Sequence, residues 1–480
     1  MIAGGEAAVP AARERLIALS GAGAKIVVVA LKMPEGWKET TASLVKPSKE
    51  PLALEGVQGV WVEDATGLSP ADRAALRGAK GRGATIGGGP GLGSQFADSA
   101  SDSHGLERGL AALEGAIVVG GWSGDSKVLQ RALEDGSGLV AVGIPSSAAL
   151  VVQGRGMSVV GAGDAGLALR DGAAGPFFVE VLKPGARADW IQWRRRAIEQ
   201  TRPVFPPKRM PEPIVPKGTL FIVGGGGMPA GLLERFIEAA GGPEAPLVYV
   251  PCEFAEEIVG EPGFVRSLRS AGAKNVTWIH TKDRNKADSD PEILSKLREA
   301  GGVWFGGGRQ WNLVDSYHDT ESHRLMLSVL DRGGAIGGSS AGASIQSQYM
   351  PRGDPLGNTE NIAPGYERGL GFLPGVGVDQ HFTQRKRHPD MTKLMARYPQ
   401  ILGIGLDEST AIVVRGSVAE VTGRGSVFVY DRRKPVPDQG PDFEELKAGD
   451  RYELKERRRI LNPLIPLPRQ SPLKAPDRVR

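Results

Sequence analysis

One serine, one histidine and one glutamate have types and an order in the chain that fit covalent catalysis, and the serine is the most distinctive. Residues 333–343 read Gly-Gly-Ala-Ile-Gly-Gly-Ser-Ser-Ala-Gly-Ala. Of the two serines, only Ser340 has glycine both two positions before and two positions after it. Such glycines let a strand, a tight turn and a helix pass close together while the hydroxyl stays accessible. The pattern favours Ser340 over Ser339 as a nucleophile, with a helix-like segment over 343–350.

Two segments downstream supply the groups that a serine nucleophile needs. His381 ends an apolar run, and Glu408 stands at the mouth of a second apolar segment. A serine hydroxyl reacts poorly until a base takes its proton, and that base needs a carboxylate to fix its tautomer. Taken singly, His381 also fits a histidine at a strand end, and Glu408 a solvated loop carboxylate. The chain has only six histidines, so few bases are available to Ser340.

The order Ser, His, Glu differs from the Ser, Asp, His order of α/β-hydrolases. Four motifs contain or precede these residues: FGGGRQWNL (305–313), GGSSAGASI (337–345), DQHFTQRKR (379–387) and LGIGLDESTAIVVRG (402–416). With these motifs, residues 218–450 resemble the cyanophycinase and dipeptidase E group of serine peptidases. The resemblance is closer to cyanophycinase, which shares the Asp-Gln-His-Phe and Asp-Glu segments.

The resemblance implies a role for each position that matches a motif. Ser340 would be the nucleophile, His381 the general base and Glu408 the acid that orients the base. The backbone N–H groups of Ala341 and of a glycine in 306–308, Gly308 first, would form the oxyanion hole. The substrate pocket would be lined by Gln310, Asp379, Gln380, Arg385 and Arg387.

Two departures from the family pattern bear on the substrate. Arg309 stands where cyanophycinases tend to have an acidic residue, and Asp390 stands where a further pocket arginine is expected. Arg385 and Arg387 can grip carboxylates in a bidentate manner, although together with Lys386 they also fit an ordinary solvated basic loop.

The function that follows is that of a serine-type, exopeptidase-like hydrolase of aspartyl peptide bonds. The resemblance implies a peptide or cyanophycin-like substrate with β-aspartyl-arginine linkages. An α-aspartyl dipeptidase or another aspartyl amide hydrolase is the alternative within this class. A catalytically silent binding or scaffold protein is the alternative from another class.

The elements that must position these residues follow an α/β pattern, because apolar strand-like runs alternate with helical patterns. The runs lie at 25–31, 59–62, 84–88, 116–120, 219–223, 247–250, 302–305 and 335–338. Residues 202–216 contain six prolines and read as an extended linker. We expect two doubly wound α/β domains, flavodoxin-like or class I glutamine-amidotransferase-like. Their expected bounds are 1–201 and 218–450, with a proline-rich linker at 202–217 and a basic, proline-rich tail at 451–480.

The two halves also look like an internal duplication. The segments that match in order are 56–67 with 299–310, 83–94 with 333–344, 115–122 with 375–382, and 142–163 with 404–425. In this register the first half has lost the chemical residues: Ser340 faces Pro90, His381 faces Gly121, Glu408 faces Ser146 and Gln310 faces Gly67. Chance similarity between two α/β halves is the alternative, but it does not account for the shared Gly-Val-Trp and Ala-x-Val-Val-x-Gly strings. Because cyanophycinases are typically homodimers, we expect a catalytically silent first half that takes the partner's place. Such an internal pseudo-dimer leaves the chain free to be a monomer.

Composition limits the remaining classes of function. Hydrophobic residues make up 40% of the 480 residues and charged residues 24%, as in ordinary globular proteins. No apolar run reaches the ~18 residues of a membrane span, and a net charge of +4 without an aromatic-interleaved basic patch gives little support to nucleic-acid binding. The single cysteine, Cys252, allows no internal disulfide and is expected in a core. No signal peptide is visible, which leaves a cytoplasmic and an exported location both open.

Two patterns that suggest a cofactor or a metal fail on their spacing. Gly224–Gly227 follows an apolar strand as a dinucleotide loop would, but the third glycine of G-x-G-x-x-G would fall on Pro229. His318 and His323 are five positions apart and do not share a helix face. We therefore expect neither a cofactor nor a metal.

Overall fold

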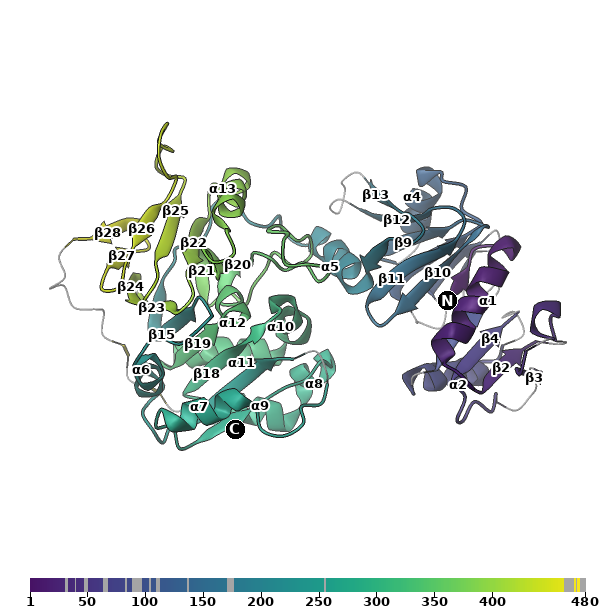
Figure 1. Cartoon of the computed structure of the whole chain (residues 1–480), viewed down its shortest axis with the longest axis horizontal. Helices are drawn as coiled ribbons and strands as arrows, with labels where there is room; N and C mark the ends of the chain where they lie inside the picture. The colour runs from purple at the N-terminus through teal and green to yellow at the C-terminus, as the bar shows by residue number, and fades with distance from the viewer. Residues whose placement is uncertain are drawn as a thin grey trace. The chain divides into compact units, whose positions relative to one another are not determined.

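The computed structural model describes residues 1–30, 33–38, 40–46, 51–63, 68–82, 84–88, 97–102, 105–108, 113–135, 138–170, 177–253, 256–461, 470–471 and 473–474. The chain forms two compact units, Met1–Pro203 and Val204–Arg480, which Figure 1 shows in purple to blue and in teal to yellow. Among the helices of the described residues, none has both the length and the hydropathy of a bilayer span.

A nine-stranded sheet organises the C-terminal unit. Its order is β17-β16-β18-β19-β15-β23-β24-β27-β28, parallel from β17 to β15 and antiparallel from there on. These strands are β15 (Val215–Val223), β16 (Leu247–Cys252), β17 (Val276–Trp278), β18 (Gly302–Gly308), β19 (Ala335–Ser339), β23 (Thr410–Gly416), β24 (Val418–Gly423), β27 (Arg451–Glu453) and β28 (Arg458–Ile460).

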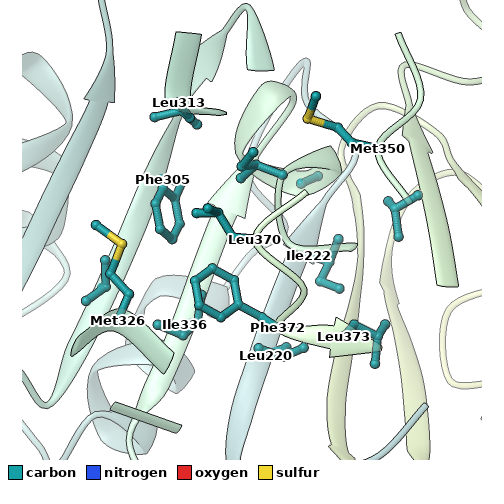
Figure 2. Packing of buried hydrophobic residues seen from close by; sticks show 14 of the residues in the cluster. Leu220, Ile222, Phe305, Leu313, Met326, Ile336, Met350, Leu370, Phe372 and Leu373 are labelled. Carbon is teal, nitrogen blue, oxygen red and sulfur yellow. The ribbon is translucent and has the colours of Figure 1, made fainter. Parts of the chain in front are cut away.

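Helices cover both faces of this sheet, as in a doubly wound fold. Side chains alternate between the two faces of a strand, so Leu220 and Ile222 enter one hydrophobic cluster while Phe221 and Val223 enter another. Figure 2 shows the first cluster, in which Leu220 and Ile222 lie with Phe305. It includes residues of α9 (Pro291–Glu299), α10 (Gln310–Tyr317) and α11 (Glu321–Asp331), whereas the second includes residues of α6 (Leu232–Ala239) and α7 (Gly263–Ser270).

A second, five-stranded sheet completes this unit, in the order β20-β21-β22-β25-β26. Its strands are β20 (Ser347–Tyr349), β21 (Leu373–Gln380), β22 (Leu402–Leu406), β25 (Val427–Asp431) and β26 (Glu444–Leu446). The remaining helices are α8 (Arg284–Ser289), α12 (Ala341–Ser344) and α13 (His388–Arg397). The parallel strands β21 and β22 end at Gln380 and Leu406, so His381 and Glu408 lie at the same edge of this sheet.

The N-terminal unit is built from an eight-stranded sheet, β14-β11-β10-β1-β5-β4-β2-β3, and a six-stranded sheet, β13-β12-β9-β8-β6-β7. The strands are β1 (Ile2–Ala3), β2 (Ile26–Val29), β3 (Ser43–Val45), β4 (Gly59–Val62), β5 (Thr85–Gly88), β6 (Ala97–Asp102), β7 (Gly105–Arg108), β8 (Leu113–Gly120), β9 (Val140–Ile144), β10 (Ala148–Gln153), β11 (Gly156–Gly161), β12 (Ala165–Arg170), β13 (Phe177–Leu182) and β14 (Arg187–Asp189). The helices are η1 (Glu6–Ala8), α1 (Val9–Ser20), η2 (Glu35–Trp37), α2 (Pro70–Gly81), α4 (Ser126–Asp135) and α5 (Trp190–Gln200).

The strand orders of the two units correspond. In the larger sheets, β3-β2-β4-β5-β1-β10-β11-β14 runs as β17-β16-β18-β19-β15-β23-β24-β27 does, and in the smaller sheets β6-β8-β9-β12-β13 runs as β20-β21-β22-β25-β26 does. The pairing register corresponds as well, because Ala148 pairs with Gly161 as Thr410 pairs with Gly423. Further matching pairs are Gly59–Thr85 with Gly302–Ala335, Ala116–Val140 with Val376–Leu402, and Ile2–Leu150 with Ile222–Ile412.

Three element boundaries differ from the sequence-based expectation. Residues 215–217 were expected in the linker, but Val215 is buried and pairs with Gly416, so they begin β15. A register shift follows Val215, and an irregularity of this kind accommodates the proline at 216. The tail was expected from residue 451, but β27 and β28 extend the main sheet to Ile460.

The third difference lies directly after the candidate nucleophile. A helix-like segment was expected over 343–350, but α12 spans one turn and β20 follows it. Ser347 and Tyr349 pair with β21 in the second sheet. The chain thus passes from the first sheet to the second within a few residues of Ser340.

Candidate active site

Ser340 occupies a sharp turn between β19 and α12. Its φ of 58° and ψ of −114° are unusual for a residue with a side chain. The flanking glycines allow this turn, because a Cβ at Gly338 would lie 2.2 Å from the carbonyl oxygen of Gly342. Ser339, in contrast, is the last residue of β19. The local geometry is that of a nucleophile elbow centred on Ser340.

Ser340, His381 and Glu408 form one chain of hydrogen bonds. The Oγ of Ser340 lies 2.8 Å from Nε2 of His381, and Nδ1 of His381 lies 2.6 Å from Oε1 of Glu408. A carboxylate can only accept, so Nδ1 carries the proton and Nε2 is left to accept from the serine hydroxyl. The structure therefore brings together the three side chains that the sequence singled out, in an arrangement suited to general-base activation of a hydroxyl.

The surroundings of His381 favour its neutral form. Burial lowers the pKa of His381 below the usual histidine value, and the nearby charges of Arg385 and Arg387 lower it further, whereas Glu408 raises it. A neutral imidazole can accept a proton, so this balance suits a base at neutral pH. Glu408 is more accessible, with 36% of its side chain exposed, and its backbone N–H donates to Oε1 of Gln384.

Backbone groups expected to form an oxyanion hole lie on two sides of Ser340. Ala341 is the first residue of α12, and the first N–H groups of a helix have no carbonyl partner within that helix. On the other side, a Cβ at Gly307 would lie 3.4 Å from Cβ of Ser340. Gly308, the glycine preferred from the sequence, has a φ of 147° and packs against Cys252. The structure thus places Gly307 next to the nucleophile, with Gly308 one residue further.

Cys252 is buried, as expected, and its thiol donates to the carbonyl oxygen of Arg309 at 3.0 Å. Burial raises the pKa of this thiol to about 12, so the sulfur is protonated at neutral pH. Nucleophilic cysteines are thiolates. Cys252 therefore packs against Gly308 of the glycine segment as a neutral side chain.

The two glutamines of the expected pocket are both buried. The side-chain amide of Gln310 donates to the carbonyl oxygens of Pro351 and Arg352 at 2.9 and 2.8 Å, so its nitrogen is engaged by the protein. Oε1 of Gln380 is buried and has no hydrogen-bond partner among the residues that the structure describes. A buried acceptor without a partner is costly to stability, and the burial of Oε1 means that protein atoms enclose it.

Asp379 and Arg387 lie in a buried cluster of charges. Asp379 is fully buried and accepts from Nε of Arg352 and from Nη1 of Arg387, while Nη2 of Arg352 donates to Asp390. Arg387 is 3% exposed and also donates to the carbonyl oxygen of Gln380. That Arg387 lines the pocket stays a prediction, and in the structure its guanidinium donates to protein oxygens.

The other two arginines near the site differ in their surroundings. Arg385 is exposed, and its charge acts on His381. Arg309, the departure from the family pattern, directs Nη2 to the carbonyl oxygen of Asp354 at 3.1 Å. Of the two arginines expected to bind carboxylates, Arg385 is thus the accessible one.

Sequence reasoning missed two residues that support this site. Arg352 bridges Asp379 and Asp390 with a positive φ of 59°, and it lies in a loop outside every motif. Asp407 accepts from the N–H groups of Thr383 and Ser426. Its position directly before Glu408 in a motif was the one available signal.

In the described ranges, no group of three or more His, Cys, Asp and Glu side chains is arranged to hold a metal ion. The two histidines noted in the sequence, His318 and His323, stack with ring centroids 5.6 Å apart, and Nε2 of His323 lies 2.9 Å from the carbonyl oxygen of Leu370.

Comparisons with known proteins fall on the unit that carries this geometry. A sequence model of peptidase family S51 matches residues 220–422. The cyanophycinase of Geminocystis herdmanii is 30% identical over 240 residues, which cover 47% of this chain and 88% of that protein. The cyanophycinase of Trichormus variabilis is 29% identical over 243 residues, with 47% and 81% covered. Among solved structures, a peptidase from an acI-B1 actinobacterium aligns at 23% identity with a TM-score of 0.39, covering 52% of this chain and 100% of that one.

Proposed function

The chain belongs to peptidase family S51, and on this basis we propose that its C-terminal unit is a serine peptidase that cleaves aspartyl peptide bonds. The observation that carries the proposal is the hydrogen-bonded chain from Ser340 through His381 to Glu408. Its support is independent of the family, because any such chain can raise the reactivity of a serine hydroxyl.

The proposed reaction begins with attack of the Oγ of Ser340 on the carbonyl carbon of the scissile bond. Nε2 of His381 takes the hydroxyl proton as the bond forms, and Glu408 stabilises the imidazolium through Nδ1. Backbone N–H groups of Ala341 and of the glycine segment 306–308 are suited to hold the oxyanion. His381 then gives the proton to the leaving amine, and water hydrolyses the acyl-enzyme with His381 again as base.

The charge of Arg385 near His381 supports a substrate with a free carboxylate. Arg385 is exposed and positively charged at neutral pH, so it can pair with a free carboxylate of an aspartyl residue. β-Aspartyl-arginine linkages, as in cyanophycin, contain such a carboxylate, and we propose them as the preferred substrate.

Two assays test this proposal. A fluorophosphonate should label the purified protein, and Ser340→Ala should abolish the labelling. Release of dipeptide or amino acid should then be measured with cyanophycin and, separately, with α-aspartyl dipeptides. Labelling at Ser340 with cleavage of the dipeptides alone would move the substrate to the α-aspartyl class, and absence of labelling would leave a silent binding protein.

We also propose that the N-terminal unit is a duplicate of the catalytic unit that performs no chemistry. The corresponding strand orders and registers support a common origin. Backbone detail supports it too, since the N–H of Gly121 donates to the oxygen of Gly4 at 2.9 Å as the N–H of His381 does to that of Gly224. Gly121 keeps the positive φ that His381 has, at 68° and 48°.

The same comparison supports the loss of chemistry. Gly121 replaces the base and Ser146 replaces the carboxylate, so neither a proton acceptor nor its partner is present at those positions. Pro90 and Gly67, which face Ser340 and Gln310 in the sequence register, lie outside the described residues. In a chain that carries Ser340→Ala, the further change Pro90→Ser should therefore give no labelling by a fluorophosphonate, whereas labelling at position 90 would contradict the proposed silence.

A further inference from the structure

The glycine run 224–227, which fails as a nucleotide loop, lies directly under the candidate triad. It follows β15 in the C-terminal unit. Three successive carbonyl oxygens, of Val223 at the end of β15 and of Gly224 and Gly225 in the run, accept hydrogen bonds from backbone N–H groups. The donors are Ser340 to Val223 at 3.0 Å, His381 to Gly224 at 2.9 Å and Ser409 to Gly225 at 2.8 Å. Ser409 is the neighbour of Glu408. One short stretch of backbone thus holds the nucleophile, the base and the acid in a common frame.

Gly225 contributes a second feature, which is the absence of a side chain. Its φ is 95°, and a Cβ there would lie 2.4 Å from Cε1 and 2.5 Å from Nε2 of His381. These distances are too short for any heavy-atom contact, and a histidine ring cannot yield by bending. The ring could escape only by rotating or shifting, and Nε2 is the atom that contacts Oγ of Ser340.

From these contacts we infer that Gly225 is a positioning residue of the active site, which sets the plane of the His381 ring by leaving room for it. The inference rests on the proposed function for its catalytic consequence and on packing alone for its structural one. A methyl group at 225 displaces Nε2 from Ser340, and a misplacement of about 1 Å in a reacting group lowers rates by about 10²-fold.

The test compares Gly225→Ala with Gly242→Ala. Gly242 has a φ of 93° and a Cβ there would meet nothing within 4 Å, so this control carries the same backbone penalty without the contact to a ring. The first measurement is the rate of fluorophosphonate labelling of Ser340. We expect labelling of Gly225→Ala to be about 10²-fold slower than that of Gly242→Ala. Equal rates in the two variants would overturn the inference.

The second measurement is thermal unfolding, which needs no activity. Gly225→Ala should lower the melting temperature of the wild-type chain more than it lowers that of His381→Ala, because the ring is then gone, while Gly242→Ala should have the same effect in both backgrounds. If Gly225→Ala does not fold, the double variant with His381→Ala should fold again. An equal loss in both backgrounds, or a double variant that stays unfolded, would overturn the inference. Should the wild-type protein resist labelling, the proposed function fails while this cycle still decides the role of Gly225.

Discussion

Ser340 combines a strained backbone with a side chain that is already engaged by its base. The positive φ is held by flanking glycines and by the bond from its N–H to Val223, so the hydroxyl needs no rearrangement before attack. Pre-organisation of this kind is what a nucleophile elbow provides.

Ser340→Ala should abolish hydrolysis and leave folding intact, because removal of the nucleophile from an interdependent triad typically costs ~10⁶ in rate. Ser339→Ala is the matched control, one residue earlier and on β19, and should cost far less. Both variants are compared by hydrolysis rate and by thermal unfolding. The assignment is wrong if Ser339→Ala is the inactive variant and Ser340→Ala retains activity.

The pH dependence of Ser340 labelling should follow the protonation of His381, since only the neutral ring accepts a proton. Burial and the charge of Arg385 lower its pKa, so the rate should rise with pH through a midpoint below the usual ~6.5. Arg385→Gln removes a positive charge, which raises the pKa and moves the midpoint to higher pH. Lys386→Gln removes an equal charge from the next position as a control. A midpoint that moves downwards in Arg385→Gln would contradict this reading.

Arg385 and Arg387 should respond differently to truncation because one is exposed and the other is buried. Arg385→Ala should raise KM for a substrate with a free carboxylate and leave the unfolding midpoint unchanged. Arg387→Ala leaves Asp379 with one partner fewer, so it should lower stability as well as activity. Steady-state kinetics and urea unfolding separate the two effects. Identical behaviour of the two variants would show that burial does not distinguish them.

At the scale of elements, much of the core was predictable, because long apolar runs bounded by glycine and proline have one reading. The runs at 59–62, 247–250 and 302–305 were predicted in this way, and the structure extends the last two to Cys252 in β16 and to Gly308 in β18. Residues 343–350 were predicted as helical because Ala-Ser-Ile has helical composition. In the structure, Ser347 and Tyr349 pair with β21 and form the strand β20. Tertiary pairing of this kind is not encoded in local propensity.

The candidate triad was accessible from the sequence for a related reason. Each of its residues lies one or two positions after the end of a strand, and each lies within a motif. Ser340 follows β19 of the nine-stranded sheet, whereas His381 and Glu408 follow β21 and β22 of the five-stranded sheet. Arg352 was not accessible, because its role depends on a loop that brings it to Asp379, 27 positions away, with no local signal. Charge pairs formed across loops are visible only after folding.

Arg352 forms ion pairs with both Asp379 and Asp390. Its removal leaves the fully buried Asp379 and the partly exposed Asp390 without a shared partner. Breaking one side of a buried pair costs about 3–5 kcal/mol, so Arg352→Ala should lower the free energy of unfolding by that order in urea titrations. Arg235→Ala, which breaks the half-exposed pair with Glu420, should cost about 1 kcal/mol or less. Equal losses would show that the cluster is not a structural anchor.

At the scale of the whole molecule, the segment after Pro203 belongs to the C-terminal unit and not to a free linker. Phe205 stacks on Tyr349 with ring centroids 6.1 Å apart, and the guanidinium of Arg368 lies 4.2 Å from the ring of Phe205. Val215 is buried in β15. A proline-rich composition identified the segment as extended, but it could not show where the extended chain packs.

A fragment of residues 204–480 should therefore be more stable than one of residues 218–480, because Val215 is buried and Phe205 is partly buried. Full burial of a side chain of this kind contributes about 1.5–3 kcal/mol, and the partly buried Phe205 contributes less than its full value. Thermal unfolding of the two fragments measures the difference. If the N-terminal unit stands in for a partner subunit, the whole chain should be monomeric in sedimentation, and 204–480 should self-associate or be less stable than the whole chain. A monomeric 204–480 fragment with the stability of the whole chain would leave the N-terminal unit as an independent module.

The shared pairing register has a consequence for mutational tolerance. Positions 121 and 381 occupy corresponding places in the two pairing registers, as do 146 and 408. The second member of each pair, His381 and Glu408, forms a chain of hydrogen bonds with Ser340. Substitutions scanned at both members of a pair would separate what the backbone requires from what catalysis requires, within a single polypeptide and under one selection. The positive φ at 121 should favour glycine, asparagine, aspartate and histidine at that site, whereas a narrower tolerance at 381 would measure the demand of the proposed chemistry.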